Sequence, residues 1–152
     1  MAFGINAVEL LKAGNRQVEG WFELLQDTDD DGDRRTLVAS LCRALTVSAE
    51  LEEEIFHPAF LQAVERDDLQ HDAAVRLDIL RKLVADIEEA NSGDELFAAR
   101  VRVLAQVFQL HVGELERDDG MFDAAEVSDL DLDRLGEDME SRRSELVAES
   151  TP

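Results

Sequence analysis

Apolar residues recur every three or four positions through most of this chain, which is the spacing of one face of an α-helix. Five segments carry the pattern, and we expect helices at about 6–26, 34–57, 68–90, 93–116 and 129–148. Short connections between the first four favour antiparallel neighbours. The sequence therefore predicts an all-α fold: an antiparallel up-down-up-down four-helix bundle with an additional C-terminal helix, forming a single domain over residues 1–152.

Capping and breaking residues mark several of the expected helix ends. Asn6 and Glu9 have the spacing of a capping box, in which two side chains satisfy free N–H groups at a helix start. Ser92 and Glu95 have the same spacing. Pro58 is expected to end or kink the second helix, because proline lacks the N–H that the helix needs. The C-terminal segment is highly charged with a thin apolar stripe, so we expect it to pack on the outside of the bundle.

The composition narrows the functional class. Lys and Arg number 15 against 36 Asp and Glu, a net charge of −21. This charge argues against nucleic acid and anionic membranes as partners, since both require basic patches, and it leaves a basic protein partner open. No leader segment and no apolar run of about 18 residues is present, so we expect a cytoplasmic protein. The single cysteine, Cys42, excludes an intramolecular disulfide and is expected to be a buried thiol.

An acidic stretch at 27–33, DTDDDGD, resembles the opening of a calcium-binding loop, with Asp27, Asp29 and Asp31 at alternating positions. The twelfth position of such a loop needs a glutamate that binds the ion with both oxygens, but here it is Val38. We therefore interpret the stretch as an acidic connector that caps the next helix.

The second predicted helix places a carboxylate on an apolar face. Ser48 and Glu52 are four residues apart and so share one side of the helix. A buried carboxylate costs several kcal/mol unless it is paired or bound to a metal, so Glu52 needs a partner. The stripe that holds both residues is Leu37, Leu41, Leu45, Ser48, Glu52 and Ile55.

The same helix carries the most specific motif of the chain. It reads Ser48-Ala-Glu-Leu-Glu52 and then Phe56-His57-Pro58. This resembles the second-helix motif of hemerythrin-like (HHE cation-binding) domains, which runs His-x-x-x-Glu followed by an aromatic residue and a proline. The stretches LLKAGNRQVEGWFELL, QLHVGELERDDGMF and LDLDRLGEDMESRRSEL also resemble this family. The resemblance covers nearly the whole chain and implies the same four-helix bundle.

Members of this family hold two irons between the four helices, mainly through histidines and two bridging carboxylates. They bind oxygen or nitric oxide, sense iron or redox state, or help to repair iron–sulfur centres. In this chain Asn15, Ser48 and Leu77 stand where the family has histidines. Leu115 stands where it has a carboxylate, and is flanked by Glu114 and Glu116.

Two of the family's ligand positions are retained, Glu52 and His111. The chain has 3 histidines in all, the others being His57 and His71, whereas a di-iron site of this family usually needs four or five. His71 is expected to be half-exposed near a helix start. The resemblance therefore implies a degenerate bundle that has lost the di-iron site.

Our main expectation is a bundle with no cofactor that acts as a non-catalytic binding or scaffold protein. It would hold a small-molecule ligand in the bundle core, where the family's metals lie. Glu52 and His111 would form a buried hydrogen-bonded pair in this pocket. The residues expected to line it are Asn15, Ser48, Glu52, Leu77, His111 and Leu115.

Two alternatives use the same residues. A single iron, zinc or manganese ion could be bound by Glu52, His111 and either Glu114 or Glu116, which would make a residual metal-binding or sensing protein. Alternatively, Glu52 and His111 could act as a metal-free acid–base dyad. No nucleophile or oxyanion-stabilising group can be named to accompany such a dyad.

Overall fold

The computed structural model describes residues 4–90 and 93–149, and all regular structure in these ranges is helical. No helix in the described ranges is both long and apolar enough to cross a membrane. The elements, in chain order, are α1 (Ala7–Gln26), α2 (Asp31–Leu51), the π-helical turn η1 (Glu52–Phe56), α3 (His57–Ala63), α4 (Asp67–Glu89), α5 (Phe97–Glu116), α6 (Met121–Glu126) and α7 (Leu132–Glu149).

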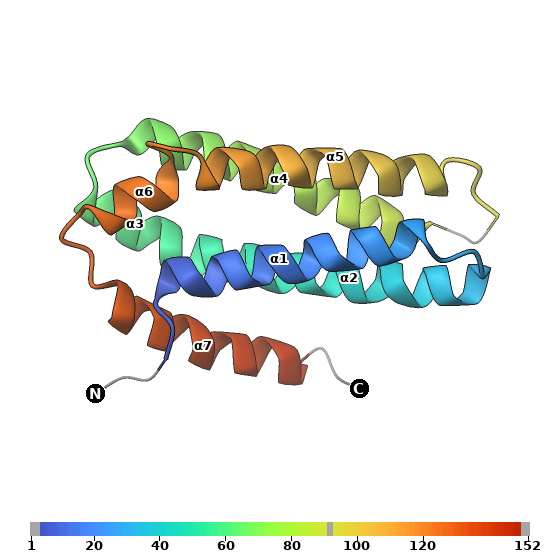
Figure 1. The fold of residues 1–152 in the computed structure, drawn as a ribbon, viewed down its shortest axis with the longest axis horizontal. Helices are drawn as coiled ribbons and strands as arrows, with labels where there is room; N and C mark the ends of the chain where they lie inside the picture. The colour runs from blue at the N-terminus through green and yellow to red at the C-terminus, as the bar shows by residue number, and fades with distance from the viewer. Residues whose placement is uncertain (1–3, 91–92, 150–152) are drawn as a thin grey trace.

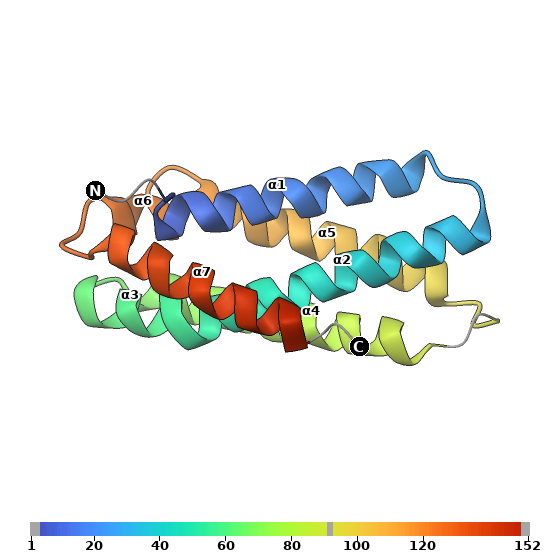
Figure 2. The same ribbon diagram turned by 90° about the horizontal axis from the view of Figure 1, so that it is seen from below.

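Four long helices form the bundle (Figure 1). α1 packs on α2, α2 packs on α4, and α4 packs on α5, with successive helices running in opposite directions. The short helices α3 and α6 lie at one end of the bundle. α7 lies outside the bundle, against α1 and α2 and away from α5, as both views show (Figures 1 and 2). The predicted up-down-up-down bundle with an external C-terminal helix is confirmed.

Helix starts follow from local caps. The Asn6 side chain accepts a hydrogen bond from the Glu9 N–H at 2.9 Å, as the sequence predicts. α2 begins at residue 31, three residues earlier than expected, because the Asp30 carboxylate accepts from the Asp33 N–H at 2.9 Å. The acidic connector thus caps the next helix. The second predicted capping box includes Ser92, which lies outside the described residues.

α5 begins later than the sequence suggested, at Phe97 rather than 93. Asp94 holds the preceding turn, since its carboxylate accepts from the Leu96 N–H at 2.8 Å and pairs with Arg100 at 2.6 Å. The other predicted helices shift by smaller amounts: α4 spans 67–89 and α7 spans 132–149.

The second helix does not end at Pro58. The chain stays helical through the proline to Ala63, by way of the π-helical turn η1. In this turn the His57 N–H bonds to the Glu52 carbonyl, five residues back instead of four. The wider turn explains a second departure from the sequence pattern. Phe56 takes the fully buried position expected of Ile55, which is only partly buried.

The buried apolar residues form two clusters, one near α3 and α6 and the other in the opposite half of the bundle. Polar side chains lie between the clusters on all four helical segments. On α1, for example, Asn15 falls between Leu11 of one cluster and Val18 of the other. The polar layer consists of Asn15 on α1, Glu52 on η1, Arg76 on α4 and His111 on α5.

α7 is attached by a close backbone approach and by one arginine. A Cβ atom on Gly136 would come within 2.7 Å of the Ile5 carbonyl oxygen, so only glycine fits there. Met139 is fully buried beneath the helix. Arg142 donates to both carboxylate oxygens of Glu54, at 2.8 and 3.3 Å. These contacts hold the N-terminal and middle parts of α7 against the bundle.

Candidate functional site

Glu52 and His111 lie close together in the polar layer, but the hydrogen bond that the sequence analysis expected between them is not formed. Glu52 is the first residue of the π-helical turn and His111 lies on α5. They are 4% and 3% exposed, and Glu52 Oε1 lies 3.5 Å from His111 Nε2. That separation is at the upper limit for a hydrogen bond. Nε2 has no hydrogen-bond partner within residues 4–90 and 93–149.

Arg76 on α4 determines which nitrogen of His111 carries a proton. The Arg76 Nε–H donates to His111 Nδ1 at 3.0 Å. An arginine side chain has no acceptor, so Nδ1 must present its lone pair. The ring is therefore neutral, with its proton on Nε2, the atom that faces Glu52. Burial lowers the pKa of Arg76, while the nearby carboxylates of Glu114, Asp72 and Glu52 oppose that effect.

His57 belongs to the same buried cluster, although the sequence analysis gave it no role. It is buried, its Nδ1 lies 3.2 Å from the Gln70 side-chain nitrogen, and its Nε2 has no hydrogen-bond partner in the described part of the chain. Burial lowers the pKa of His57, and the charge of Glu52 partly offsets this. His111 and Arg76 lower the His57 pKa further.

The π-helical turn explains why sequence reasoning missed His57. In an α-helix, residues five apart are offset by roughly 140° around the axis, so His57 would point away from Glu52. The i→i+5 bond from the His57 N–H to the Glu52 carbonyl widens the turn and reduces that offset. Arg76 was missed because it lies beside the apolar stripe of α4, where arginine is usually solvated.

A cavity of about 20 Å³ lies beside the Glu52–His111 pair. Such a volume holds about one water molecule and is far below the several hundred Å³ of pockets that bind organic ligands. Five of the six residues predicted to line a core pocket do line it: Asn15, Ser48, Glu52, Leu77 and His111. Leu115 is buried in the neighbouring apolar cluster.

The cavity is polar on several sides. Arg81 also lines it, and both Arg81 Nε and His111 Nε2 are buried donors without a partner in the described residues. Arg81 uses its two terminal nitrogens on Glu50 and Glu53, at 3.2 and 3.0 Å. A single water accepting from Arg81 Nε and His111 Nε2 and donating to Glu52 would satisfy these groups.

The other acids considered for a metal site point elsewhere. Glu116 accepts from the Asn15 side-chain amide at 3.1 Å and pairs with Arg16. Glu114 accepts from Arg117 Nε at 3.1 Å. Among residues 4–90 and 93–149, no three His, Cys, Asp or Glu side chains are placed to hold one metal ion. His71 is exposed on the first turns of α4, away from this cluster.

Comparison with known proteins identifies the class of fold. No family model matches the chain, and no curated protein matches it. One solved structure, a hemerythrin HHE cation-binding domain-containing protein from Mycobacterium kansasii, superposes with a TM-score of 0.80. The match covers 95% of this chain and 89% of that one, at 20% sequence identity. The fold is hemerythrin-like. At this identity the function must be argued from the site.

The nitrogen atoms of His111 are arranged for hydrogen bonding within this hemerythrin-like core. A metal-bound histidine usually donates its free ring N–H to an acceptor and offers its other nitrogen to the metal. His111 has the opposite arrangement, because Arg76 donates to Nδ1 and leaves the proton on Nε2. Arg81 adds a second positive side chain at the cavity wall. Leu77 presents an apolar side chain to the same cavity.

Proposed function

We propose that this hemerythrin-like bundle works without a di-iron centre, as a non-catalytic binding or scaffold protein. The hydrogen bond from Arg76 Nε to His111 Nδ1 carries the proposal. It fixes His111 in the form whose Nε2 bears a proton, and a protonated nitrogen cannot ligate a metal. It also brings a permanent positive charge close to Glu52, which interacts electrostatically with Arg76.

The buried carboxylate then has a partner other than a metal. An isolated ionised carboxylate in a protein interior is strongly disfavoured unless a cation and hydrogen bonds compensate it. Arg76 supplies charge of the sign that a metal would supply, and the His111 Nε2–H faces Glu52 Oε1 at 3.5 Å. The polar layer is thereby accounted for as a structural element of the core.

A catalytic role for the Glu52–His111 dyad is less well supported. The adjoining cavity, at about 20 Å³, has room for about one water molecule and none for an organic substrate. Arg76 occupies the lone pair of His111 Nδ1. His111 therefore has no free basic nitrogen with which to accept a proton.

One observation favours a second candidate, a site for a single iron or zinc ion. His57 and His111 each have a buried Nε2 without a hydrogen-bond partner in the described ranges, and both interact electrostatically with Glu52 or lie beside it. This arrangement would need Arg76 to leave His111 so that Nε2 could lose its proton. Glu52, His57 and His111 would also have to move toward a common point, because no three such side chains in the described ranges are placed to hold one ion. Two histidines and one carboxylate would then form the ligand set.

Metal analysis separates the two candidates. The protein would be purified through a metal-free tag without chelators, and its iron, zinc and manganese contents measured by mass spectrometry, before and after incubation with each ion. We expect far less than one ion per chain, and no difference between the wild type and His111→Ala. Stoichiometric iron or zinc in the wild type that His111→Ala removes would overturn the proposal in favour of the single-ion site.

A variant tests the assigned role of Arg76 directly. Arg76→Leu frees His111 Nδ1, so the ring can place its proton there and offer Nε2. We expect this variant to take up more zinc than the wild type in the same incubation. Arg102→Leu is the matched control, because Arg102 is exposed on α5 and makes no ion pair within the described residues. Equal zinc contents in all three proteins would contradict the role assigned to Arg76.

A further inference from the structure

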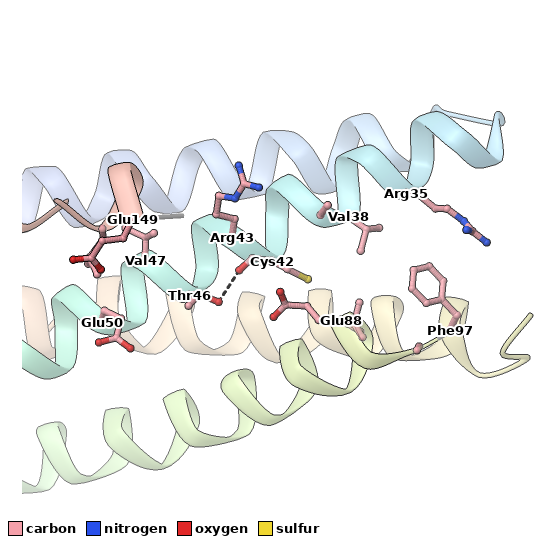
Figure 3. Close-up of a pocket in the computed structure, with 14 residues that line it drawn as sticks. Arg35, Val38, Cys42, Arg43, Thr46, Val47, Glu50, Glu88, Phe97 and Glu149 are labelled. Carbon is pink, nitrogen blue, oxygen red and sulfur yellow. Dashed lines mark hydrogen bonds between the residues drawn. The ribbon is translucent and has the colours of Figure 1, made fainter. Parts of the chain in front are cut away.

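A hollow larger than the core cavity lies along the outer side of α2. Its volume is about 740 Å³, against about 20 Å³ for the cavity beside His111. It is bounded by α2, by the end of α4, by the start of α5 and by the last turns of α7 (Figure 3). Its volume lies within the range of small-molecule sites, and nothing in the polar layer takes part in it.

The floor of this groove is apolar. Residues from four helices contribute to it: Val38, Cys42, Val47, Ile87, Phe97 and Leu146. Cys42 is 1% exposed, and burial, assisted by the charge of Glu88, raises the pKa of its thiol to about 12. The thiol therefore stays protonated near neutral pH and adds to the apolar surface. The floor suits a hydrocarbon chain better than a polar ligand.

The two ends of the groove differ in charge. Arg35 and Phe97 lie at one end, and Glu50 and Glu149 lie at the other (Figure 3). Within residues 4–90 and 93–149, Arg35 makes no ion pair, although the chain has 36 acidic residues. The acids at the far end are already engaged, because Glu50 pairs with Arg81 at 3.2 Å. Glu149 pairs with Arg142 at 3.7 Å.

Midway along the groove the charges oppose one another. Arg43 extends from α2, and Glu88 extends from α4 toward Cys42 (Figure 3). The middle therefore favours neither sign, whereas the Arg35 end favours an anion and the Glu50 end disfavours one. From Arg35 to Val47 the groove follows 13 residues of α2, which rise by about 18 Å at 1.5 Å per residue step. This length suits an extended chain of many carbons.

We propose that this groove binds a free long-chain monocarboxylate, a fatty-acid-like ligand. Its carboxylate would pair with Arg35, and its hydrocarbon chain would lie over Val38, Cys42 and Val47 toward Leu146 on α7. Arg35 at one end of the groove and the acids Glu50 and Glu149 at the other end determine this orientation of the ligand. A ligand still embedded in an anionic membrane is disfavoured as the source, because the net charge of −21 repels such a surface.

The groove would be the site of the proposed binding role, with a fatty-acid-like ligand. Its binding of such a ligand does not depend on whether the core holds a metal ion. The groove contains neither Glu52, His57 nor His111. A positive metal analysis would overturn the metal-free proposal and leave the groove unaffected. Conversely, failure of the groove to bind a carboxylate would leave the metal analysis unaffected.

The test is isothermal titration calorimetry of the full chain with dodecanoate, kept below its micelle concentration. Dodecanol and dodecyltrimethylammonium have the same chain with a neutral or a cationic head, and they measure the contribution of the carboxylate. We expect saturable binding of dodecanoate with a stoichiometry of one, weaker binding of dodecanol, and the weakest binding of the cation.

Variants locate the site. Arg35→Ala is expected to weaken dodecanoate binding about fivefold, the effect of losing one exposed ion pair, and to leave dodecanol binding unchanged. Arg102→Ala removes an equivalent charge from α5 and should change neither. Ala39→Trp places a large ring in the groove from an exposed position of α2, so it should weaken both ligands at least tenfold without unfolding the helix.

Three results would overturn the proposal. The first is absence of saturable dodecanoate binding to the folded wild type. The second is equal binding of the carboxylate and the trimethylammonium compound, which would show that the chain alone is recognised. The third is binding that Ala39→Trp leaves intact, which would place the ligand elsewhere. Circular dichroism of each variant confirms that it remains folded.

Discussion

Arg76 connects the chemistry of the buried layer to its stability. Its Nε–H group holds His111 at 3.0 Å, and its charge lies near the Glu52 carboxylate. Arg76 itself is only partly buried, so solvent screens part of this attraction. The interaction between Arg76 and Glu52 is therefore expected to be moderate, and it can be measured separately from the cost of removing either side chain.

A double-mutant cycle with Glu52→Gln and Arg76→Gln measures that interaction. Both substitutions keep a polar side chain and remove one charge each. We expect each single variant to be destabilised and the coupling free energy to be about 1 kcal/mol, toward the lower part of the range for residues in one network. Urea unfolding followed by circular dichroism gives the four free energies.

The control cycle replaces Arg76→Gln with Arg102→Gln. Arg102 is exposed on α5 and carries the same charge, so its coupling to Glu52 should be close to zero. A coupling energy for Glu52 and Arg76 no larger than that of the control would show that the arginine does not compensate the carboxylate.

At the level of the helices, the close contact between α7 and the start of α1 determines how α7 is held. A Cβ atom at Gly136 would lie 2.7 Å from the Ile5 carbonyl oxygen and 2.9 Å from the Ala7 nitrogen. Both are backbone atoms and cannot rotate away. Only Gly136 and Met139 are buried among the described residues of α7, so few other contacts can compensate for a displacement.

Gly136→Ala is therefore expected to destabilise the protein by about 1–3 kcal/mol, through overpacking against the first turn of α1. Gly113→Ala is the matched control, because it is also a helical glycine and no described atom lies within 4 Å of its added Cβ. That control should stabilise the protein by about 0.5–1 kcal/mol, since alanine favours the helix. Urea unfolding measures both, and equal effects would contradict the role of the close approach.

The helices themselves could largely be read from the sequence. Repeats such as Val8, Leu11, Val18 and Phe22 on α1 indicate a buried stripe, and the structure buries all of them. The buried stripe predicted for the second helix was less accurate, because Leu37, Ser48 and Ile55 are only partly buried. The π-helical turn changes the register after Glu52, and no local residue pattern announces an i→i+5 bond.

The site was predictable where residues lie on one stripe and unpredictable where distant residues converge. Glu52 and His111 could be paired because each is a polar residue on an apolar face and both match ligand positions of the family that the sequence resembles. Arg76 and Gln70 could not be assigned, because a partly exposed polar side chain on a helix gives no sign of the imidazole that it contacts. The groove beside α7 was also missed, since it depends on where the C-terminal helix rests.

For the molecule as a whole, the buried imidazole of His57 makes stability depend on pH. Burial lowers its pKa in the folded state below the value of 6.5, which the unfolded chain recovers. Below about pH 6.5 the unfolded state therefore binds more protons than the folded state. The neutral His57 ring makes its full contribution to the free energy of unfolding above pH 6.5. As the pH falls toward the folded-state pKa, this contribution is lost by up to about 1.4 kcal/mol per pH unit.

We therefore expect the free energy of unfolding to fall between pH 7.5 and pH 5.5, and His57→Gln to reduce that fall. The exposed His71 provides the control, so His71→Gln should behave as the wild type. Glu52, His111 and Arg76 face His57 and are unchanged in both variants. Urea titrations at the two pH values supply the comparison. The same pH response in all three proteins would exclude His57 as its source.

The π-helical turn at Glu52–Phe56 also affects how this chain should be aligned with others. Because the His57 N–H bonds five residues back, the turn contains one more residue than an α-helical turn would. In an alignment the turn acts as a single inserted residue whose effect is local. A gap of one position belongs within 52–56 when the partner sequence has a regular helix there, and without it every residue of α3 would be matched to the wrong neighbour.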